Sequence, residues 1–226
     1  ASDVYKRQNK EYVILGKGVG FGKKVSQRFD KPEGCTTYRL EQETERGSAK
    51  ELVKGIEPEY LEIADAILTE SQKVFGDSID RGILFPLADH ISFAVARIRR
   101  NEQISNPLTE DIKVLFYSEF KVAETLKTIL RERLQIEIDD HEVGYVALHI
   151  HSAIGDEKVS VAMQTARAVR ECIDMLEKAT GKPIDVLSLS YNRLMNHMKY
   201  MVARASTGEK LNPVSYTHLT LPTTER

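Results

Sequence analysis

The chain has 226 residues, of which 41% are hydrophobic, so it is long enough for more than one packed core. Its 32 Lys and Arg residues nearly balance 34 Asp and Glu residues, and the net charge of −2 excludes a general attraction to nucleic acid or anionic membranes, so any polyanion site must be local. No apolar run approaches the roughly 20 residues that span a bilayer, no signal-peptide pattern is present, and the isolated Cys35 and Cys172 suggest neither a disulfide framework nor a zinc site. The sequence therefore predicts a soluble, cytoplasmic protein.

The two ends of the chain differ from the rest. Residues 1–8 (ASDVYKRQ) and 213–226 (PVSYTHLTLPTTER) carry no helical or strand periodicity that continues into their neighbours, and the second segment abruptly ends a long helical pattern. We interpret both as foreign segments joined to a natural sequence. A disordered native tail is the alternative.

The segment from residue 9 to residue 46 begins with a β-type run at 12–15 that leads into a glycine cluster. The cluster is not a known nucleotide loop, because it lacks both the GxGxxG spacing and a closing GK[ST]. The window 10–31 holds six basic against two acidic residues. Glycines let a backbone approach a ligand closely, Phe21 offers a stacking surface and the lysines can meet phosphates, as RNA binding requires. A glycine-rich β-turn with solvated lysines is the alternative.

The polar stretch at 41–55 suits a short linker or a solvated first helix, and the pattern after it is helical. Apolar residues recur there at three- and four-residue spacing, which places them on one face of each helix. Five amphipathic helices are predicted to begin near Pro58, Pro86, Asn106, Phe120 and Asp140. Short connections between them predict a bundle of about 100 residues.

The most informative feature is an internal repeat with an offset of 107 residues. Leu87, His90, Phe93, Val95, Ala96 and Arg97 recur as Leu194, His197, Tyr200, Val202, Ala203 and Arg204. The offset is the size of one helical domain, so the repeat predicts a duplicated unit. The last helix of a second copy would lie beyond residue 226, and we therefore expect that copy to be incomplete.

The position of His90 within its helix bears on its role. It follows Leu87 by three residues and precedes Ala94 by four, which places it at the edge of the buried stripe. An imidazole at that edge is partly exposed and can attack a phosphoryl donor, while Arg97, two turns later, could hold the added charge. A helix-packing histidine with ordinary hydrogen bonds is the alternative. The recurrence of the pattern at His197 favours the phosphoryl acceptor.

His149 and His151 raise the question of a metal site. Residues two apart on a helix point in nearly opposite directions and cannot chelate one ion, whereas on a strand they could. The acidic pair at 139–140 before a helical apolar pattern favours the helix. We therefore predict no metal, a second phosphoryl acceptor at His149, and no such role for His151. His141 is predicted to lie in a loop.

Five segments of the chain resemble transcription antiterminators of the BglG/LicT type. VILGKGVGFGKK is similar to the glycine and aromatic core of the co-antiterminator RNA-binding domain. Four others are similar to successive helices of a PTS regulation domain: PEYLEIADAI, PLADHISFAVARIR, NPLTEDIKVLFYSEF and EVGYVALHIHSA. The resemblance covers about residues 10–210. It implies a small all-β RNA-binding domain at 9–46, an all-α helical-bundle regulatory domain at 47–157, and a truncated second regulatory domain at 158–212.

In this family the RNA-binding domain dimerises and clamps a hairpin in nascent mRNA, which prevents formation of an overlapping terminator. The regulatory domains report sugar supply through two partners in the phosphotransferase system, the phosphocarrier HPr and a sugar permease. The resemblance implies phosphorylation at His90 and His149 in the first regulatory domain and at His197 in the second. Arg97 and Arg204 are the candidates to support the added charge. The implied RNA-binding residues are Gly16, Lys17, Gly18 and Phe21.

The sequence departs from the family at its start. The family's opening strand, with its Lys and Asn contacts to RNA, should precede Asn9, where ASDVYKRQ stands, so we expect weak RNA binding by this chain. Phosphorylation adds about −1.5 to −2 charges at a histidine. If two first regulatory domains pair across their histidine faces, like-charge repulsion would open the homodimer and release the hairpin.

Two other functions are alternatives to an RNA-binding antiterminator. A DNA-binding activator could carry the same regulatory domains, but it should begin with helix-turn-helix segments, and residues 12–21 show none. A phosphotransfer enzyme for a small molecule needs a substrate site, and no set of nucleophile, base and oxyanion donors is evident. We therefore predict a regulator rather than an enzyme, with no cofactor and no membrane insertion.

Overall fold

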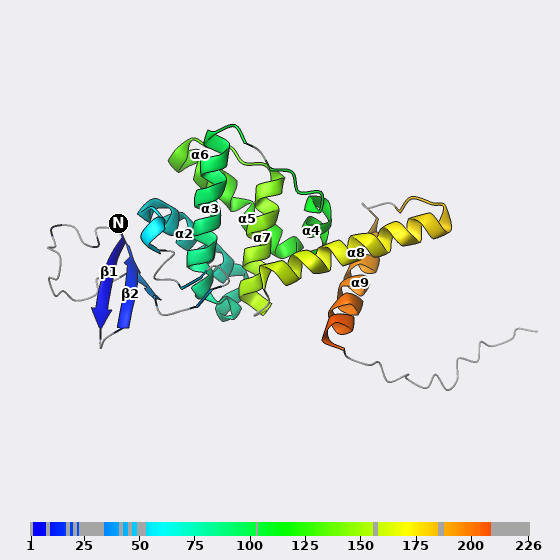
Figure 1. The fold of residues 1–226 in the computed structure, drawn as a ribbon, viewed down its shortest axis with the longest axis horizontal. Helices are drawn as coiled ribbons and strands as arrows, with labels where there is room; N and C mark the ends of the chain where they lie inside the picture. The colour runs from blue at the N-terminus through cyan, green and yellow to red at the C-terminus, as the bar shows by residue number, and fades with distance from the viewer. Residues whose placement is uncertain are drawn as a thin grey trace, which may run out of the picture.

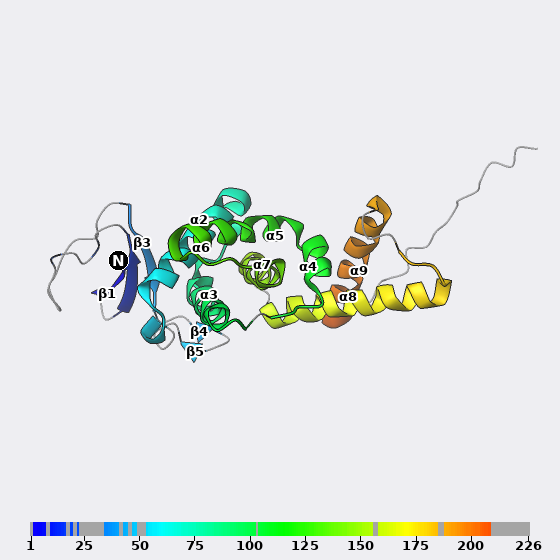
Figure 2. The same ribbon diagram turned by 90° about the horizontal axis from the view of Figure 1, so that it is seen from above.

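The computed structural model describes residues 2–7, 10–16, 19, 22, 34–40, 43–44, 47–48, 53–102, 104–155, 158–184 and 188–208. The predicted foreign tail at 213–226 lies outside these residues. The described chain is elongated: a small β-sheet lies at one end, helices α2 to α7 form the middle, and α8 and α9 extend at the other end (Figures 1 and 2). The division into a small β part followed by a helical part agrees with the prediction.

The sheet has three antiparallel strands in the order β1 (Ser2–Arg7), β2 (Lys10–Leu15) and β3 (Thr36–Arg39). Strand β2 is central and is the β-type run expected from the sequence. Its apolar residues are buried, and Tyr38 of β3, which pairs with Val13, is buried with them. The sheet lies against α2 and the turn before α3.

The expectation that residues 1–8 carry no strand was wrong. Ser2–Arg7 pair along the whole of β2, from Ser2 opposite Leu15 to Arg7 opposite Lys10. Strands pair through backbone N–H and C=O groups, so a segment can join a sheet without the alternation that marks a strand in a sequence. The foreign origin of the segment remains a prediction.

The polar stretch at 41–55 is also more structured than a linker. It contains a second antiparallel pair, β4 (Glu43–Thr44) and β5 (Gly47–Ser48), in which Glu43 lies opposite Ser48. Polar residues suit a short pair of this kind because its backbone supplies the pairing.

The helical body begins as predicted. Helix α2 (Pro58–Phe75) has Pro58 in its first turn and buries a stripe that includes Ile63, Ala64, Ile67 and Leu68, and it ends at Gly76 in a positive-φ conformation. Two short 3₁₀ turns follow, η1 (Gly76–Ser78) and η2 (Arg81–Ile83). Helix α3 (Leu84–Arg99) then starts two residues before the predicted position.

The middle of the body differs from the prediction in one element. Helix α4 (Thr109–Leu115) follows the expected start, but the predicted fourth helix is two helices, α5 (Tyr117–Ala123) and α6 (Thr125–Leu134). Apolar spacing continues through both, so the break at Glu124 leaves no mark in the pattern. The helix predicted from Asp140 is α7 (Asp140–Gly155). Residues 58–155 thus hold six α-helices rather than five.

The core is centred on α7, which packs against α3, α4 and α5. Its apolar residues Val143, Val146, Ala147, Leu148 and Ile150 are all buried. Helices α2 and α3 pack together on the side nearer the sheet (Figure 1). The pairing of α3 with α7 brings His90 and His149 close together.

Three side chains connect the sheet to the helical body. Arg81 of η2 donates hydrogen bonds to the Tyr38 hydroxyl at 2.8 Å and to the Asp65 carboxylate of α2 at 2.7 Å. The Tyr38 hydroxyl also donates to Asp65. Burial, followed by the adjacent Asp65 charge, raises the pKa of Tyr38 far above its usual value. The group therefore stays neutral and fixes β3 to α2.

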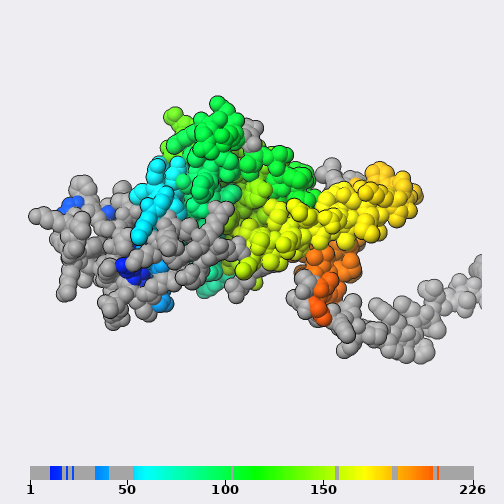
Figure 3. Space-filling model, viewed as in Figure 1, coloured from blue at the N-terminus to red at the C-terminus, as the bar shows by residue number. Residues whose placement is uncertain are grey.

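The last two helices cross each other at a large angle beside the body (Figures 1 and 2). Helix α8 (Val159–Thr180) contacts α7 and α4, and α9 (Leu189–Thr207) contacts α4 and α8 (Figures 1 and 3). Buried Asp111 of α4 joins them, because the Tyr191 hydroxyl lies 3.3 Å from its carboxylate and Arg170 Nη1 lies 3.9 Å from it. No helix in the described residues is long and apolar enough to cross a membrane.

The sequence repeat is visible in the burial of α3 and α9. Positions 107 residues apart face inward in both helices. The pairs are Leu84 with Tyr191, Ala88 with Met195, Ile91 with Met198, and Val95 with Val202. Phe93 and Tyr200 are exposed in both. The agreement is what a duplicated helix predicts, while a truncated second regulatory domain remains a prediction.

Candidate functional site

His90 lies more deeply than its position in the sequence suggests. It is carried by α3 at the edge of the buried stripe, as expected, but only 9% of the residue is exposed because α7 covers it. Its Nε2 atom makes no hydrogen bond and lies 3.6 Å from Glu142 Oε2 of α7. A buried nitrogen without a hydrogen bond is unusual in a packing histidine.

Glu142 is the charged centre of the site. Its carboxylate is buried and accepts a hydrogen bond at 2.7 Å from Arg97 Nη2. Arg97 lies two turns after His90 on the same face of α3. Burial alone would raise the pKa of Glu142, but His90 and Arg97 together outweigh it and hold that pKa below its usual value. The site therefore contains a carboxylate that stays ionised at neutral pH.

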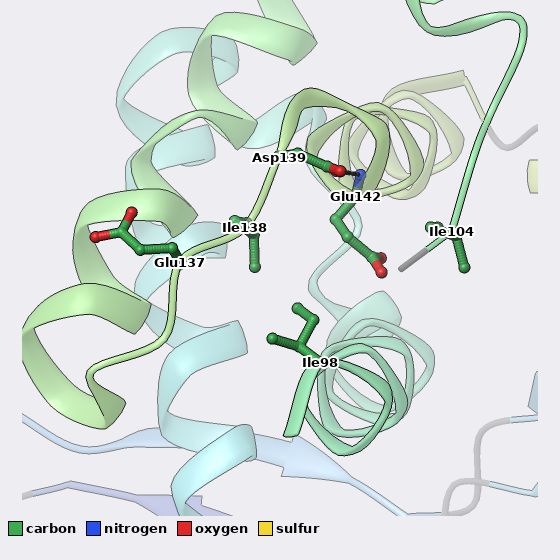
Figure 4. Close-up of a pocket in the computed structure, with 6 residues that line it drawn as sticks. All are labelled: Ile98, Ile104, Glu137, Ile138, Asp139 and Glu142. Atoms are coloured by element: carbon green, nitrogen blue, oxygen red, sulfur yellow. Dashed lines mark hydrogen bonds between the residues drawn. The ribbon is translucent and has the colours of Figure 1, made fainter. Parts of the chain in front are cut away.

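The first turn of α7 fixes the direction of Glu142. The Asp139 carboxylate accepts hydrogen bonds from the backbone N–H groups of His141 and Glu142, at 3.0 and 3.2 Å, and so caps the start of α7. Figure 4 shows the Glu142 side chain extending from this turn toward Ile98 and Ile104. The prediction of a loop at His141 was wrong: it lies in the first turn of α7, where its ring contacts the Thr109 hydroxyl at 2.7 Å.

His149 lies on α7, the helix that also carries Glu142, and its ring is close to that of His90. The two imidazole rings lie 5.3 Å apart between centroids, and the Tyr145 ring lies 5.7 Å from His90. All three border a pocket of about 440 Å³ that is also lined by Arg97 and by the first turn of α8. The structure thus brings both predicted acceptors of the first domain, with the predicted supporting arginine, to one pocket.

His151 lies on another face of α7. Its Nδ1 is 2.8 Å from the Glu119 carboxylate, and its ring lies 4.3 Å from that of Phe116. Burial would raise the pKa of Glu119, but the contact with His151 lowers it overall. His149 and His151 therefore have separate surroundings, as the helical spacing predicts. The described residues hold no group of three or more metal-ligating side chains.

His197 does not share the environment of His90. It lies exposed on α9, between the buried residues Met195 and Met198. Arg204 follows two turns later and is partly buried. The structure therefore places His197 at the surface, away from the pocket that His90 and His149 line.

The predicted RNA-binding loop is described in part only. Lys17, Gly18 and Phe21 lie outside the described residues. Gly16 follows β2, and a side chain at this position would collide with the Cys35 sulfur atom. Close packing thus accounts for the glycine at position 16 independently of any ligand.

Two residues of the site were not predicted from the sequence: Tyr145, which lines the pocket, and Glu142, which contacts His90 and Arg97 beside it. Both precede His149 by one or two helical turns, at seven and four residues, and so share its face of α7. This spacing was present in the sequence. What it could not show is which face of α3 meets that face of α7.

A sheet-containing module joined to a helical domain with a histidine pocket defines a class of two-part regulator, and comparison with known proteins identifies both parts. Residues 3–47 match the CAT RNA binding domain family, and residues 65–153 match the PRD domain family. The chain belongs to the family of transcription antiterminators that join a CAT RNA-binding domain to a PRD domain. The first match includes strands β1 to β3 from Asp3 onward, and the second includes His90, Arg97 and His149 but ends before α8.

Several known proteins are similar to this chain over most of its length. The GlcA/glcB genes antiterminator of Staphylococcus carnosus (strain TM300) is 30% identical over 206 residues, which cover 89% of this chain and 71% of the relative. The transcription antiterminator LicT of Bacillus subtilis (strain 168) is 25% identical over 205 residues, covering 91% and 74%. A solved structure, "Crystal structure of GlcT CAT-PRDI", has a TM-score of 0.57 and 26% identity, covering 66% of this chain and 89% of that one. The alternative of a DNA-binding activator is not favoured.

Proposed function

We propose that this antiterminator binds an mRNA hairpin through its CAT domain and is switched by phosphorylation of His90 and His149 in response to sugar supply. The observation that carries the proposal is the convergence of His90, His149 and Arg97 on one pocket. HPr and a sugar permease of the phosphotransferase system are the proposed donors, and His197 is the proposed acceptor of the second regulatory domain. This function places the protein in the cytoplasm.

The reaction at each acceptor is a phosphoryl transfer. An unprotonated imidazole nitrogen attacks the phosphorus of a phosphorylated donor protein, a P–N bond forms, and the bond between phosphorus and the donor side chain breaks. The product carries about −1.5 to −2 charges beside the Glu142 carboxylate. Arg97 can then turn from Glu142 toward the phosphoryl group, because both are acceptors for its guanidinium. Glu142 and the phosphoryl group therefore compete for Arg97, and this competition is the proposed cause of the structural response.

The response we propose acts through a homodimer. Two first regulatory domains pair with their pockets facing, so the added charges repel each other across the interface. Separation of the domains moves the two CAT domains apart and lowers their affinity for the hairpin. A dimer that tightens on phosphorylation at His90, measured by analytical ultracentrifugation, would contradict this step.

The phosphorylation step is tested by mapping. The protein is incubated with phosphoenolpyruvate, Enzyme I, HPr and a sugar permease, and phosphohistidine is located by mass spectrometry under conditions that avoid acid. Label is expected at His90, His149 and His197. His151→Ala is the matched control, because His151 lies on the same helix as His149 but outside the pocket, and it should leave labelling intact. Absence of label from all three acceptors overturns the proposal.

The RNA-binding step rests on the CAT family match and on the excess of basic residues in the window 10–31. Lys17 and Phe21 are proposed to contact phosphate and base, with Gly16 and Gly18 shaping the loop. Gel-shift titration should show a hairpin RNA bound in preference to duplex DNA, with Lys17→Ala reducing the salt dependence of binding. Replacing residues 1–8 with a strand rich in Lys and Asn should strengthen binding if the present segment weakens it.

A further inference from the structure

The first turn of α8 forms one wall of the histidine pocket. Val159, Ser160 and Met163 line the same space as His90 and His149. Helix α8 is the longest in the described chain, with 22 residues, and it begins at this wall (Figures 1 and 2). The positive end of a long helix therefore faces the two proposed acceptors.

The start of α8 has backbone donors to offer. Lys158, at the N-cap position, has an extended backbone and makes no side-chain cap. In any α-helix the first N–H groups have no acceptor within the helix, so Val159 and Ser160 present theirs outward. The aligned peptide dipoles add a partial positive charge at this end, and together these features bind phosphate groups at many helix N-termini.

A second observation concerns His90, which lines the pocket, is nine-tenths buried and has an Nε2 atom that makes no hydrogen bond. A phosphoryl oxygen can accept a hydrogen bond from this imidazole, whereas the Glu142 carboxylate, 3.6 Å from Nε2, opposes an anion there. Arg97 is the one cation among the described residues that line the pocket, and its charge is already matched by Glu142. A dianionic group in this pocket needs further donors, and the α8 N-terminus is the wall that has them.

We infer that the N-terminus of α8 binds the phosphoryl group carried by His90 or His149, through the backbone N–H groups of Val159 and Ser160 and the Ser160 hydroxyl. The inference rests on the proposed phosphorylation and names its receptor. Its consequence is a connection between domains, because α8 continues into the α8–α9 pair that carries His197. Phosphorylation of the first regulatory domain would thus tighten the attachment of the segment that follows it.

The test measures hydrogen exchange at the first turn of α8 in the full chain. One arm adds inorganic phosphate to the unmodified protein, and the other compares protein before and after phosphorylation. In both arms exchange at residues 159–162 should slow, by about tenfold or more after phosphorylation if one charge-assisted hydrogen bond of at least about 1.5 kcal/mol forms. The phosphate arm needs no labelling, so it tests the anion site even if the histidines take up no label.

Two variants decide whether backbone donors are responsible. Val159→Pro removes one N–H group at a position where proline suits a helix, and the extended Lys158 backbone is compatible with a following proline. Val159→Ala keeps the N–H group and is the matched control. Ser160→Asp places a negative charge at the helix start, which favours the helix itself but repels a phosphoryl group. Helical content measured by circular dichroism verifies that α8 still forms.

The expected pattern is protection in wild type and Val159→Ala, and reduced protection in Val159→Pro and Ser160→Asp. Wild-type protein whose α8 start is unaffected by phosphate and by phosphorylation overturns the inference, while label at His90 and His149 would leave the proposed function intact. Equal protection in all four proteins also overturns it. Protection by phosphate without any histidine label would instead support the anion site and contradict the proposed phosphorylation.

Discussion

Replacing Glu142 with glutamine removes the buried negative charge beside His90 and Arg97 while keeping the side chain's shape. The carboxylate is 3% exposed and accepts a 2.7 Å hydrogen bond from Arg97, whose side chain is 26% exposed. A charge-assisted bond contributes about 1.5–3 kcal/mol, and breaking a fully buried pair costs about 3–5 kcal/mol. Because water still reaches Arg97 and glutamine can still accept a bond, we expect a loss of about 1–3 kcal/mol in the free energy of unfolding.

The same substitution should change how stability depends on pH. The pKa of Glu142 is lowered in the folded chain, so its stabilising effect is present above the usual value of about 4.3 and is lost as the pH falls through the folded value. Wild type and Glu142→Gln should therefore differ most near neutral pH and converge as the pH falls below that folded value. Urea unfolding followed by circular dichroism should show a midpoint lower by about 0.5–1.5 M, for a urea slope of about 2 kcal/mol per M.

The matched control for this measurement is Glu137→Gln. Glu137 also pairs with an arginine, Arg131, at 2.5 Å, and its pKa is also lowered, but both side chains are more than half exposed. Solvent weakens such pairs, so this variant should lose less stability than Glu142→Gln. Equal midpoints for wild type and Glu142→Gln at pH 7, or an unchanged difference at acid pH, would refute the reasoning.

Two further predictions concern the contacts at either end of the helical body. Arg81→Met removes the donors to Tyr38 and Asp65 and should speed amide exchange in β3, with a cost of about 1–3 kcal/mol; unchanged exchange there would mean that the bonds do not hold the sheet. Burial, followed by the charge of Asp111, raises the pKa of Tyr191 to about 12, so the α9 packing that it supports should persist at about pH 10 and weaken as the pH passes about 12. The ultraviolet titration of wild type minus Tyr191→Phe should show one phenol ionising near 12, and a difference curve centred near 10 would contradict the prediction.

The elements that the sequence predicted well are those in which local pattern and tertiary packing agree. Helix α2 combines Pro58 in its first turn, an apolar stripe on one face and Gly76 at its end, and each of these features acts within a few residues. The division of α5 from α6 was not predictable in the same way. Phe116 and Glu124 bound α5, yet the apolar spacing at Phe120, Ala123 and Leu126 continues across the break.

The sequence predicted the histidines and the arginine of the site, but not how deeply His90 is buried. Periodicity placed His90 at the edge of a stripe, and an edge position can be open or covered according to what packs beside it. Here α7 covers it, and the buried contact with Glu142 follows from that packing. Strand β1 was missed for a related reason, because its pairing partner in β2 and not its own side-chain pattern determines that it is a strand.

The packing of α7 determines which helix can respond to charge in the pocket. Nine of its 16 residues are buried, on faces toward α3, α4 and α5, so moving it would open cavities on several sides at once. Helix α8 has an exposed outer face and buries only five of its 22 residues, Ala162, Thr165, Ala166, Val169 and Ile173. A helix that buries a smaller share of its residues exposes less apolar surface when it shifts. A phosphoryl group at His149 should therefore leave α7 in place and change the position of α8, the helix whose first turn meets that group.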